Sequence, residues 1–300
     1  MRILRTRRLA GLLAFVAGAS WLPTPFLHAS ETAKIVLVAG RPSHGPGDHE
    51  FNAGCKLLTK CLADVPGIEP VFVAGGWPKD ESVFDGAKAV VFFMDGGGGH
   101  PMIQGDHLEK LQKMMDQGVG LGCLHYAVEV PKGKPGDKFL DWIGGYYESG
   151  FSTNPHWSAD IKSLPKHPIT RGVEPFAIVD EWYYNIRFRP EMKGVTPIIV
   201  AKPDSKTRQG ATASPRGPYK HIVAEDGRDE VLAWVVERPD GGRGFGFTGG
   251  HKHLNWGDPN FRKLVLNAIV WLAKKDVPAQ GISSHVTAEE LKQNLDPKKK

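Results

Sequence analysis

The chain alternates short, uninterrupted apolar runs with longer segments in which apolar residues recur at helical spacing. The runs at 34–39 and 89–94, and the one beginning at Val119, are typical of parallel strands buried on both faces. Between them, 49–63 and 105–116 have the spacing of amphipathic helices. The pattern predicts further strands at 68–73, 196–201, 230–236 and 243–248, and further helices at 138–143 and 259–273. Such alternation predicts an α/β fold with a doubly wound, mostly parallel sheet.

Between these two groups of elements the pattern loosens. Residues 144–160 are rich in aromatic and polar side chains, and 176–184 form a strand-like stretch. We find no internal repeat and no second core, so we predict one domain over 33–275. Residues 276–300 are polar and end in three lysines, so we expect a loosely attached C-terminal tail.

Residues 1–29 differ from the rest of the chain. Four arginines precede a short apolar run and a small-residue junction, which is the pattern of a secretory signal peptide. Removing it lowers the formal charge from +5 to +1, so we expect no nucleic-acid partner and no membrane partner for the mature chain. We therefore predict an exported protein, periplasmic or extracellular. The Arg7-Arg8 pair leaves twin-arginine export open.

The three cysteines do not predict a disulfide. Cys55 and Cys61 lie six residues apart on one predicted helix, roughly 9 Å along its axis, which is beyond the roughly 7 Å that a disulfide spans. Cys123 lies within a predicted buried strand and is the only cysteine considered for catalysis.

The central strand ends in a predicted sharp turn at His125. A nucleophile elbow requires small residues two positions before and after the exposed side chain. Cys123 and Ala127 meet this requirement for His125. The elbow therefore presents an imidazole at the carboxyl edge of the sheet, where ligands bind in such folds.

Other polar side chains follow predicted strands or lie close to them. Three imidazoles and a carboxylate that meet in a crevice suit zinc, manganese or iron. We predict metal ligation by His44, His125 and His251, and catalytic roles for His125, Asp180 and Glu181. The predicted substrate contacts are Asp95, His100, Tyr126, His156, Tyr183, His253 and Trp256.

Simpler interpretations exist for several of these residues. His44 would otherwise cap the next helix, Glu181 would pair with a nearby arginine, and the aromatic residues would pack in the core. His253 lies two residues after His251, and side-chain direction alternates along an extended segment. The glycine run 96–99 lacks both the P-loop and the GxGxxG spacing, so we expect no nucleotide cofactor.

Several segments together resemble one known family. They are the loop carrying His44, the elbow at His125, the Asp180-Glu181-Trp182-Tyr183 block and the segment from Gly249 to Phe261. In order and spacing they are similar to the ThuA-like, or trehalose-utilisation, family over roughly residues 33–275. This resemblance implies a flavodoxin-like fold similar to class I glutamine amidotransferases. The cysteine of those enzymes is replaced at the elbow by His125, so we expect no glutaminase activity.

The resemblance implies a role in metabolising trehalose or related disaccharides through 3-keto-glycosides. The first hypothesis is a metal-assisted hydrolase, lyase or isomerase acting on a keto-disaccharide or glycoside. The second is a non-catalytic sugar-binding module on the same fold, and the third is a Cys123-dependent hydrolase. In the first two a small-molecule sugar is the partner. The sequence leaves the oligomeric state open, including a homodimer.

Overall fold

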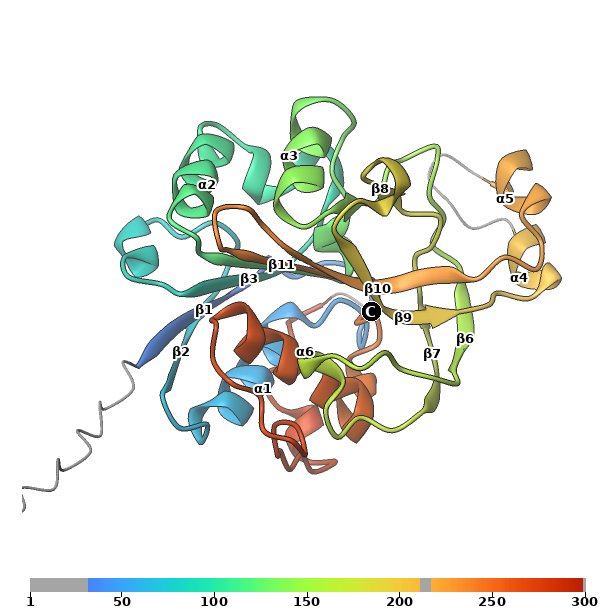
Figure 1. Ribbon diagram of the computed structural model, residues 1–300. Coiled ribbons are helices and arrows are strands. Elements are labelled where there is room, and N and C mark those ends of the chain that lie inside the picture. The colour runs from blue at the N-terminus through green and yellow to red at the C-terminus, as the bar shows by residue number, and fades with distance from the viewer. Residues whose placement is uncertain (1–31, 211–216, 299–300) are drawn as a thin grey trace, which may run out of the picture. The chain divides into compact units, whose positions relative to one another are not determined.

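A seven-stranded sheet in the order β2-β1-β3-β4-β11-β10-β9 forms the centre of the computed structural model (Figure 1). The structure describes residues 32–210 and 217–298, so the predicted signal peptide lies outside the described residues. The strands are β1 (Ala33–Ala39), β2 (Ile68–Val73), β3 (Ala89–Phe93), β4 (Gly120–Leu124), β9 (Val195–Ala201), β10 (Glu230–Glu237) and β11 (Arg243–Phe247). The strands from β2 to β11 in this order are parallel, and only β10 runs antiparallel to its neighbours. The predicted α/β fold with a mostly parallel sheet is confirmed.

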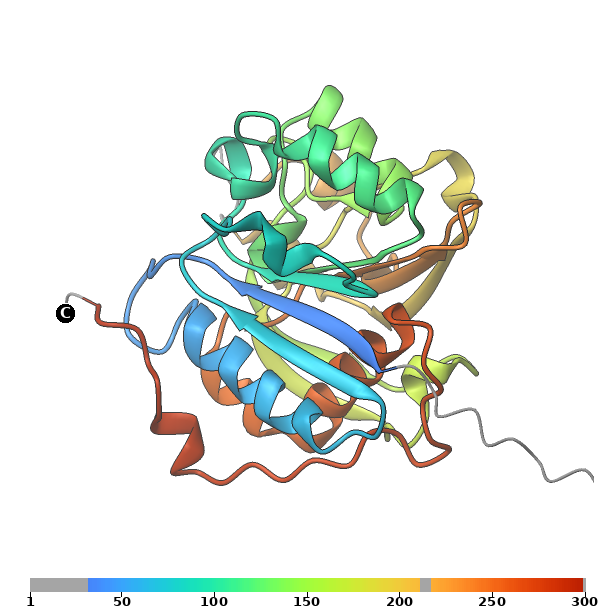
Figure 2. The ribbon, with the colours of Figure 1, turned by 90° about the vertical axis from the view of Figure 1, so that its left-hand side faces the viewer.

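Helices cover both faces of the sheet (Figures 1 and 2). Helices α1 (Phe51–Ala63) and α6 (Pro259–Leu272) lie on one face, and α2 (His107–Asp116) and α3 (Lys134–Trp142) lie on the other. Two shorter helices, α4 (Ser205–Gln209) and α5 (Lys220–Ala224), follow β9. Within the described residues, no helix is both long enough and apolar enough to cross a bilayer.

Alternating residues of each central strand supply two separate cores. In β1, Ile35 and Leu37 pack on the α1 and α6 side, whereas Val36 and Val38 pack on the α2 and α3 side. All four side chains are fully buried. A continuous apolar run is therefore required here, because neither face of the strand meets water.

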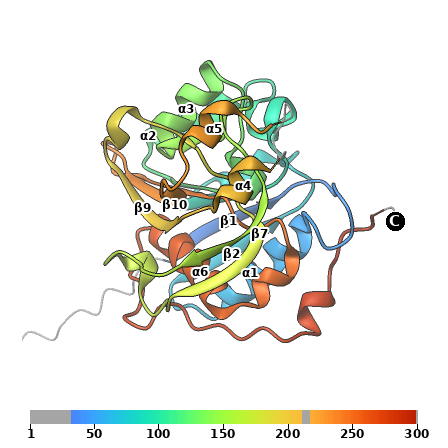
Figure 3. The same cartoon turned by 90° about the vertical axis from the view of Figure 1, so that its right-hand side faces the viewer.

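The middle of the chain forms two small sheets outside the main one. Strands β6 (His156–Ile161) and β7 (Phe176–Glu181) pair antiparallel, as do β5 (Gly145–Tyr146) and β8 (Arg187–Phe188). Figure 3 shows the β6–β7 pair from the side of β9, against which β6 packs. The end of β7 therefore carries Glu181 toward the main sheet.

The C-terminal segment packs against the fold along the α1 and α6 layer (Figure 2), in contrast to the expected loose attachment. Val277 and Ile282 are buried. Lys298 forms an ion pair with Glu50 at 3.2 Å and donates to the backbone carbonyl of Asp48. Apolar anchors within a polar sequence, and one buried ion pair near its end, explain the difference.

Candidate metal centre

The turn after β4 places His125 at the carboxyl edge of the sheet. His125 opens the short 3₁₀ helix η4 (His125–Val128) and has a φ of 53°. This left-handed conformation is uncommon for residues other than glycine, and such strain clusters at functional sites. The small flanking residues Cys123 and Ala127 are both fully buried. The geometry agrees with the predicted elbow.

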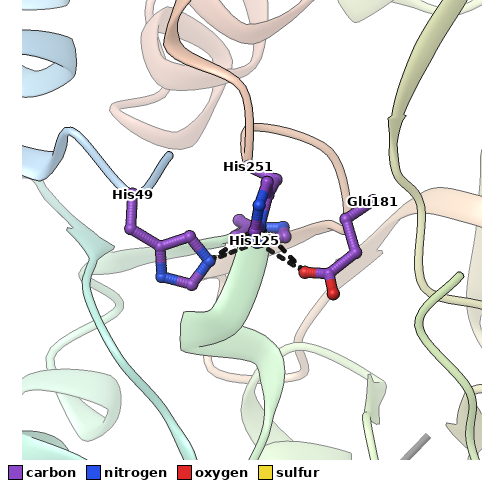
Figure 4. Close-up of side chains that lie close together, drawn as sticks. All are labelled: His49, His125, Glu181 and His251. Atoms are coloured by element: carbon purple, nitrogen blue, oxygen red, sulfur yellow. Dashed lines mark hydrogen bonds and ion pairs between the residues drawn. The ribbon is translucent and has the colours of Figure 1, made fainter. Parts of the chain in front are cut away.

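Four side chains from separate segments converge at this edge (Figure 4). They are His49 from the loop before α1, His125, Glu181 from the end of β7, and His251 from the loop after β11. Nε2 of His49 lies 3.0 Å from Nε2 of His125 and 2.9 Å from Nδ1 of His251. A carboxylate oxygen of Glu181 lies 2.9 Å from the same Nδ1 of His251.

The nitrogen of each imidazole that points away from the cluster faces an acceptor. Nδ1 of His125 donates to the carbonyl of Thr248 at 2.9 Å. Nδ1 of His49 faces the Asp95 carboxylate at 3.1 Å, and Nε2 of His251 faces Asp48 at 3.5 Å. Metal-ligating histidines are held in this way by carbonyls and carboxylates, which fix the tautomer and aim the lone pair.

This arrangement is unfavourable without a cation. If Nδ1 of His125 and Nδ1 of His49 carry their protons outward, both Nε2 atoms present lone pairs to each other at 3.0 Å. The two side chains are at most 1% exposed, so water does not screen the contact. Nitrogen ligands about 2.0–2.1 Å from a tetrahedral ion stand about 3.3 Å apart. Five of the six separations are 2.9–3.4 Å, and the sixth, between His49 and Glu181, is within 4.8 Å, which fits a single ion held by three nitrogens and one oxygen.

The cluster also perturbs the protonation of its members. Burial lowers the pKa of His49, and the neighbouring imidazoles lower it further. For Glu181, burial opposes ionisation, but the hydrogen bonds and charges of His125 and His251 outweigh it, so its pKa is lowered. Burial likewise opposes protonation of His251, but the hydrogen bond that His251 donates to the Glu181 carboxylate raises the pKa of His251. The shifts at His49 and Glu181 favour the neutral imidazole and the ionised carboxylate that bind metals, whereas a metal at His251 would displace the proton that its raised pKa favours.

Asp180, predicted to be catalytic, is instead used to hold the loop that carries His251. Its buried carboxylate accepts backbone N–H groups of Gly250, His251 and Lys252 at 2.8–3.3 Å. With its oxygens committed to these donors, Asp180 positions His251, and the adjacent Glu181 enters the cluster.

Several other predicted residues surround the cluster. The half-exposed ring of His44 lies over His49 at 3.6 Å, outside the buried group, so His49 occupies the position predicted for His44. Asp95 orients His49, and the ring of His156 lies 4.8 Å from that of His251. The predicted substrate contacts Tyr126 and Tyr183 also lie here: the ring of Tyr126 is 5.8 Å from His49, and the hydroxyl of Tyr183 is 3.1 Å from Nε2 of His125.

Three predicted substrate contacts lie in buried surroundings of their own. Nε2 of His100 donates to the carbonyl of Ala127, and Nδ1 accepts from Met102, so both ring nitrogens are used structurally. His253 is 2% exposed and opens the 3₁₀ helix η7 (His253–Gly257), apart from the four residues of the cluster. Trp256 is fully buried between Phe93 and Phe261.

Sequence reasoning missed His49, which the helical pattern placed inside the first helix. The structure begins α1 at Phe51 and gives His49 a φ of 48°, so its ring turns to the sheet edge. The signal that could have revealed it is the second histidine of the Gly/Pro-rich loop. Sequence reasoning also missed Asn154, whose amide donates to Glu181 at 3.0 Å, and Glu129 at the end of η4.

The cysteines do not contribute to the site. All three are free and buried. Cys123 is fully enclosed within β4, and burial raises the pKa of its thiol. A thiolate is the reactive form of cysteine, so the geometry argues against the Cys123-dependent hydrolase.

The fold and the cluster together define a class: an α/β domain that gathers histidines at the carboxyl edge of its sheet. The family model described as "ThuA: Trehalose utilisation" matches residues 55–272. The chain belongs to the ThuA family, which confirms the resemblance.

Solved structures agree on the fold. A ThuA-like protein from Parabacteroides merdae has a TM-score of 0.57 at 16% identity, covering 83% of this chain and 92% of that one. A ThuA-like protein from Bacteroides uniformis has a TM-score of 0.55 at 16% identity, covering 85% and 96%. No curated protein matches the chain.

Proposed function

We propose that this protein is a metal-dependent enzyme of carbohydrate metabolism that acts, after export, on a keto-disaccharide or keto-glycoside. One observation carries the metal dependence: three imidazole nitrogens and one carboxylate oxygen face one another while their outer atoms are held. The sugar substrate is supported by membership of the trehalose-utilisation family. The exported location rests on the signal-like pattern of residues 1–29.

Zinc, manganese and iron all suit this mixed nitrogen and oxygen ligand set. A divalent ion bound there would polarise a substrate carbonyl or lower the pKa of water. The chain supplies a hydroxyl donor beside the cluster, that of Tyr183. Burial and the charge of Glu181 raise its pKa, so the hydroxyl stays protonated and can hydrogen-bond a substrate oxygen.

A ketone next to the glycosidic carbon makes elimination, hydrolysis or isomerisation accessible to one base and one electrophile. The ketone acidifies the neighbouring C–H, so the site needs to bind the carbonyl and move a proton. Tyr126 and His156 lie beside the cluster and would contact the sugar, because sugar rings present apolar faces next to their hydroxyls.

The test is an assay of protein stripped with a chelator and reloaded with zinc, manganese or iron. We expect one equivalent of metal per chain and metal-dependent conversion of 3-keto-trehalose, with both lost in His125→Ala. If the stripped protein and His125→Ala bind the sugar as well as the untreated protein and convert none, the chain is a sugar-binding module.

A further inference from the structure

The backbone of Glu129 is fixed where η4, the turn that begins at His125, ends. Its N–H donates to the carbonyl of Tyr126 at 3.0 Å, and its own carbonyl accepts the N–H of Gly97 at 3.0 Å. An isolated parallel bridge also pairs Glu129 with Tyr147. The turn that creates the elbow at His125 therefore also determines where Glu129 stands.

The carboxylate of Glu129, in contrast, is not engaged. It is partly buried, yet no described residue gives it a hydrogen bond or an ion pair. The carboxylate of Glu148 differs from that of Glu129, because it accepts hydrogen bonds from the hydroxyl of Tyr146 and from the guanidinium of Arg187. A partly buried carboxylate that serves the fold is normally paired in this way, so the open carboxylate of Glu129 is available to a ligand.

Glycines keep the space next to this carboxylate open. A Cβ on Gly97 would lie 3.5 Å from both a carboxylate oxygen of Glu129 and the hydroxyl of Tyr126. A Cβ on Gly96 would approach the carbonyl of Tyr126 to 2.2 Å. Gly96 is therefore required by close packing on the elbow, and the absence of a side chain at Gly97 leaves Glu129 and Tyr126 facing a common space.

We propose that Glu129 is a catalytic residue, the acid and base that moves the substrate proton in the reaction of the histidine cluster. This inference rests on the proposed function. The carboxylate takes the hydrogen of the carbon between the ketone and the glycosidic carbon, as a proton. The electron pair of that C–H bond forms the new carbon–carbon double bond, and the glycosidic C–O bond breaks with its pair on oxygen. The carboxyl returns the proton to that oxygen, which releases the second sugar and regenerates the carboxylate.

The electrostatics of the site agree with this role. Burial, and then the negative charge of Glu181, raise the pKa of Glu129 to about 7. A group that both takes and returns a proton works best when its pKa lies near the working pH. Glu181 is held ionised by its histidines, so the two carboxylates have different tasks, as paired carboxylates in active sites do.

The experiment compares Glu129→Gln with wild type on 3-keto-trehalose in D₂O, following deuterium at the 2-position and sugar release by NMR. The matched control is Glu109→Gln, which removes an exposed carboxylate on α2 that is paired with Lys134 of α3. We expect Glu129→Gln to bind one equivalent of metal while exchange and release fall at least 100-fold. Glu109→Gln should match wild type. Exchange and release in Glu129→Gln within threefold of wild type would overturn the assignment.

A second readout needs no substrate. Carbon-13 NMR of the glutamate carboxyls in ion-free protein should show one signal that titrates near pH 7 and is missing from Glu129→Gln. If no carboxyl titrates above pH 5.5, the proposal is overturned.

Loss of metal binding in Glu129→Gln would place Glu129 among the ligands and also overturn the proposal. If wild type itself binds no metal and converts no keto-sugar, the proposed function fails first, which separates the two failures.

Discussion

Strand β4 has a buried polar side chain at each end, and the two differ in how they are satisfied. At the amino end, Arg238 donates to the carbonyl of Val119 at 2.7 Å and to the carboxylate of Asp240 at 3.0 Å. At the carboxyl end, Nε2 of His125 has two imidazole nitrogens, a carboxylate oxygen of Glu181 and the hydroxyl of Tyr183 as neighbours. The comparison shows that burial alone does not mark a site. A buried group with complementary partners supports the fold, whereas buried groups that share the same need require a ligand.

The largest effect is expected at the carboxyl end. His125→Ala removes a ligand and leaves three, so stoichiometric zinc binding should be lost in isothermal titration calorimetry. The matched control, His167→Ala, removes a partly buried imidazole that caps a 3₁₀ helix away from the cluster. It should bind zinc as wild type does. If His125→Ala bound zinc as tightly as wild type does, the carboxyl end of β4 would not be a metal site, and the difference proposed between the two ends of the strand would be wrong.

Replacing Arg238 at the amino end of β4 should lower the stability of the protein and leave its metal binding unchanged. Arg238→Met removes the ion-pair partner of Asp240 and leaves the carbonyls of Val119, Trp142 and Arg243 without this donor. Removing one partner of a buried pair costs about 3 kcal/mol or more, so the free energy of unfolding in urea should fall by about that amount. Metal stoichiometry should stay at one. A change in metal affinity without a change in stability would contradict this account of Arg238.

The outer contacts of the cluster should have a smaller effect. Asp95→Asn weakens the acceptor for Nδ1 of His49, and such changes lower metal affinity by about 10- to 100-fold. Asp106→Asn, an exposed carboxylate paired with Lys110, is the control. Competition with a chromogenic chelator measures both, and Asp95→Asn should bind more weakly than Asp106→Asn.

The smallest expected effect is on the pH dependence of stability. Because the pKa of Glu129 is raised in the folded state, the folded protein binds more protons than the unfolded chain between pH 4.5 and about 7. The stability therefore falls as the pH rises through this window, and remains lower above it. Glu129→Gln has no such loss, so above pH 7 the ion-free variant should be more stable by about 1–2 kcal/mol, discounted for partial exposure. Urea unfolding from pH 4.5 to 8 measures the free energy of unfolding of both proteins. If the difference between Glu129→Gln and wild type stayed the same across this range, the pKa of Glu129 would not be shifted.

The parallel strands and their helices could be predicted from the sequence because each strand is buried on both faces. That burial produces the continuous runs of β1 and β3, and the elbow at His125 followed from the small residues around it. The site was harder to predict because it depends on loop conformation. A φ of 48° at His49 reverses the direction of its ring, and no periodicity encodes that.

The roles of Asp180 and Glu181 could not be assigned from the sequence either. Adjacent residues at the end of a strand point in different directions, so one supports the loop of His251 and the other joins the cluster. The C-terminal segment, residues 276–300, is likewise polar in composition. Its attachment depends on a few buried contacts, such as Lys298 with Glu50, that composition does not show.

The central claim is that one divalent ion is held by His49, His125, Glu181 and His251. The most direct test is anomalous diffraction from crystals of the zinc-loaded protein, measured on both sides of the zinc absorption edge. We predict a single strong peak about 2.0–2.2 Å from Nε2 of His49, Nε2 of His125, Nδ1 of His251 and a carboxylate oxygen of Glu181. A zinc-saturated crystal with no peak among these four atoms would contradict the claim.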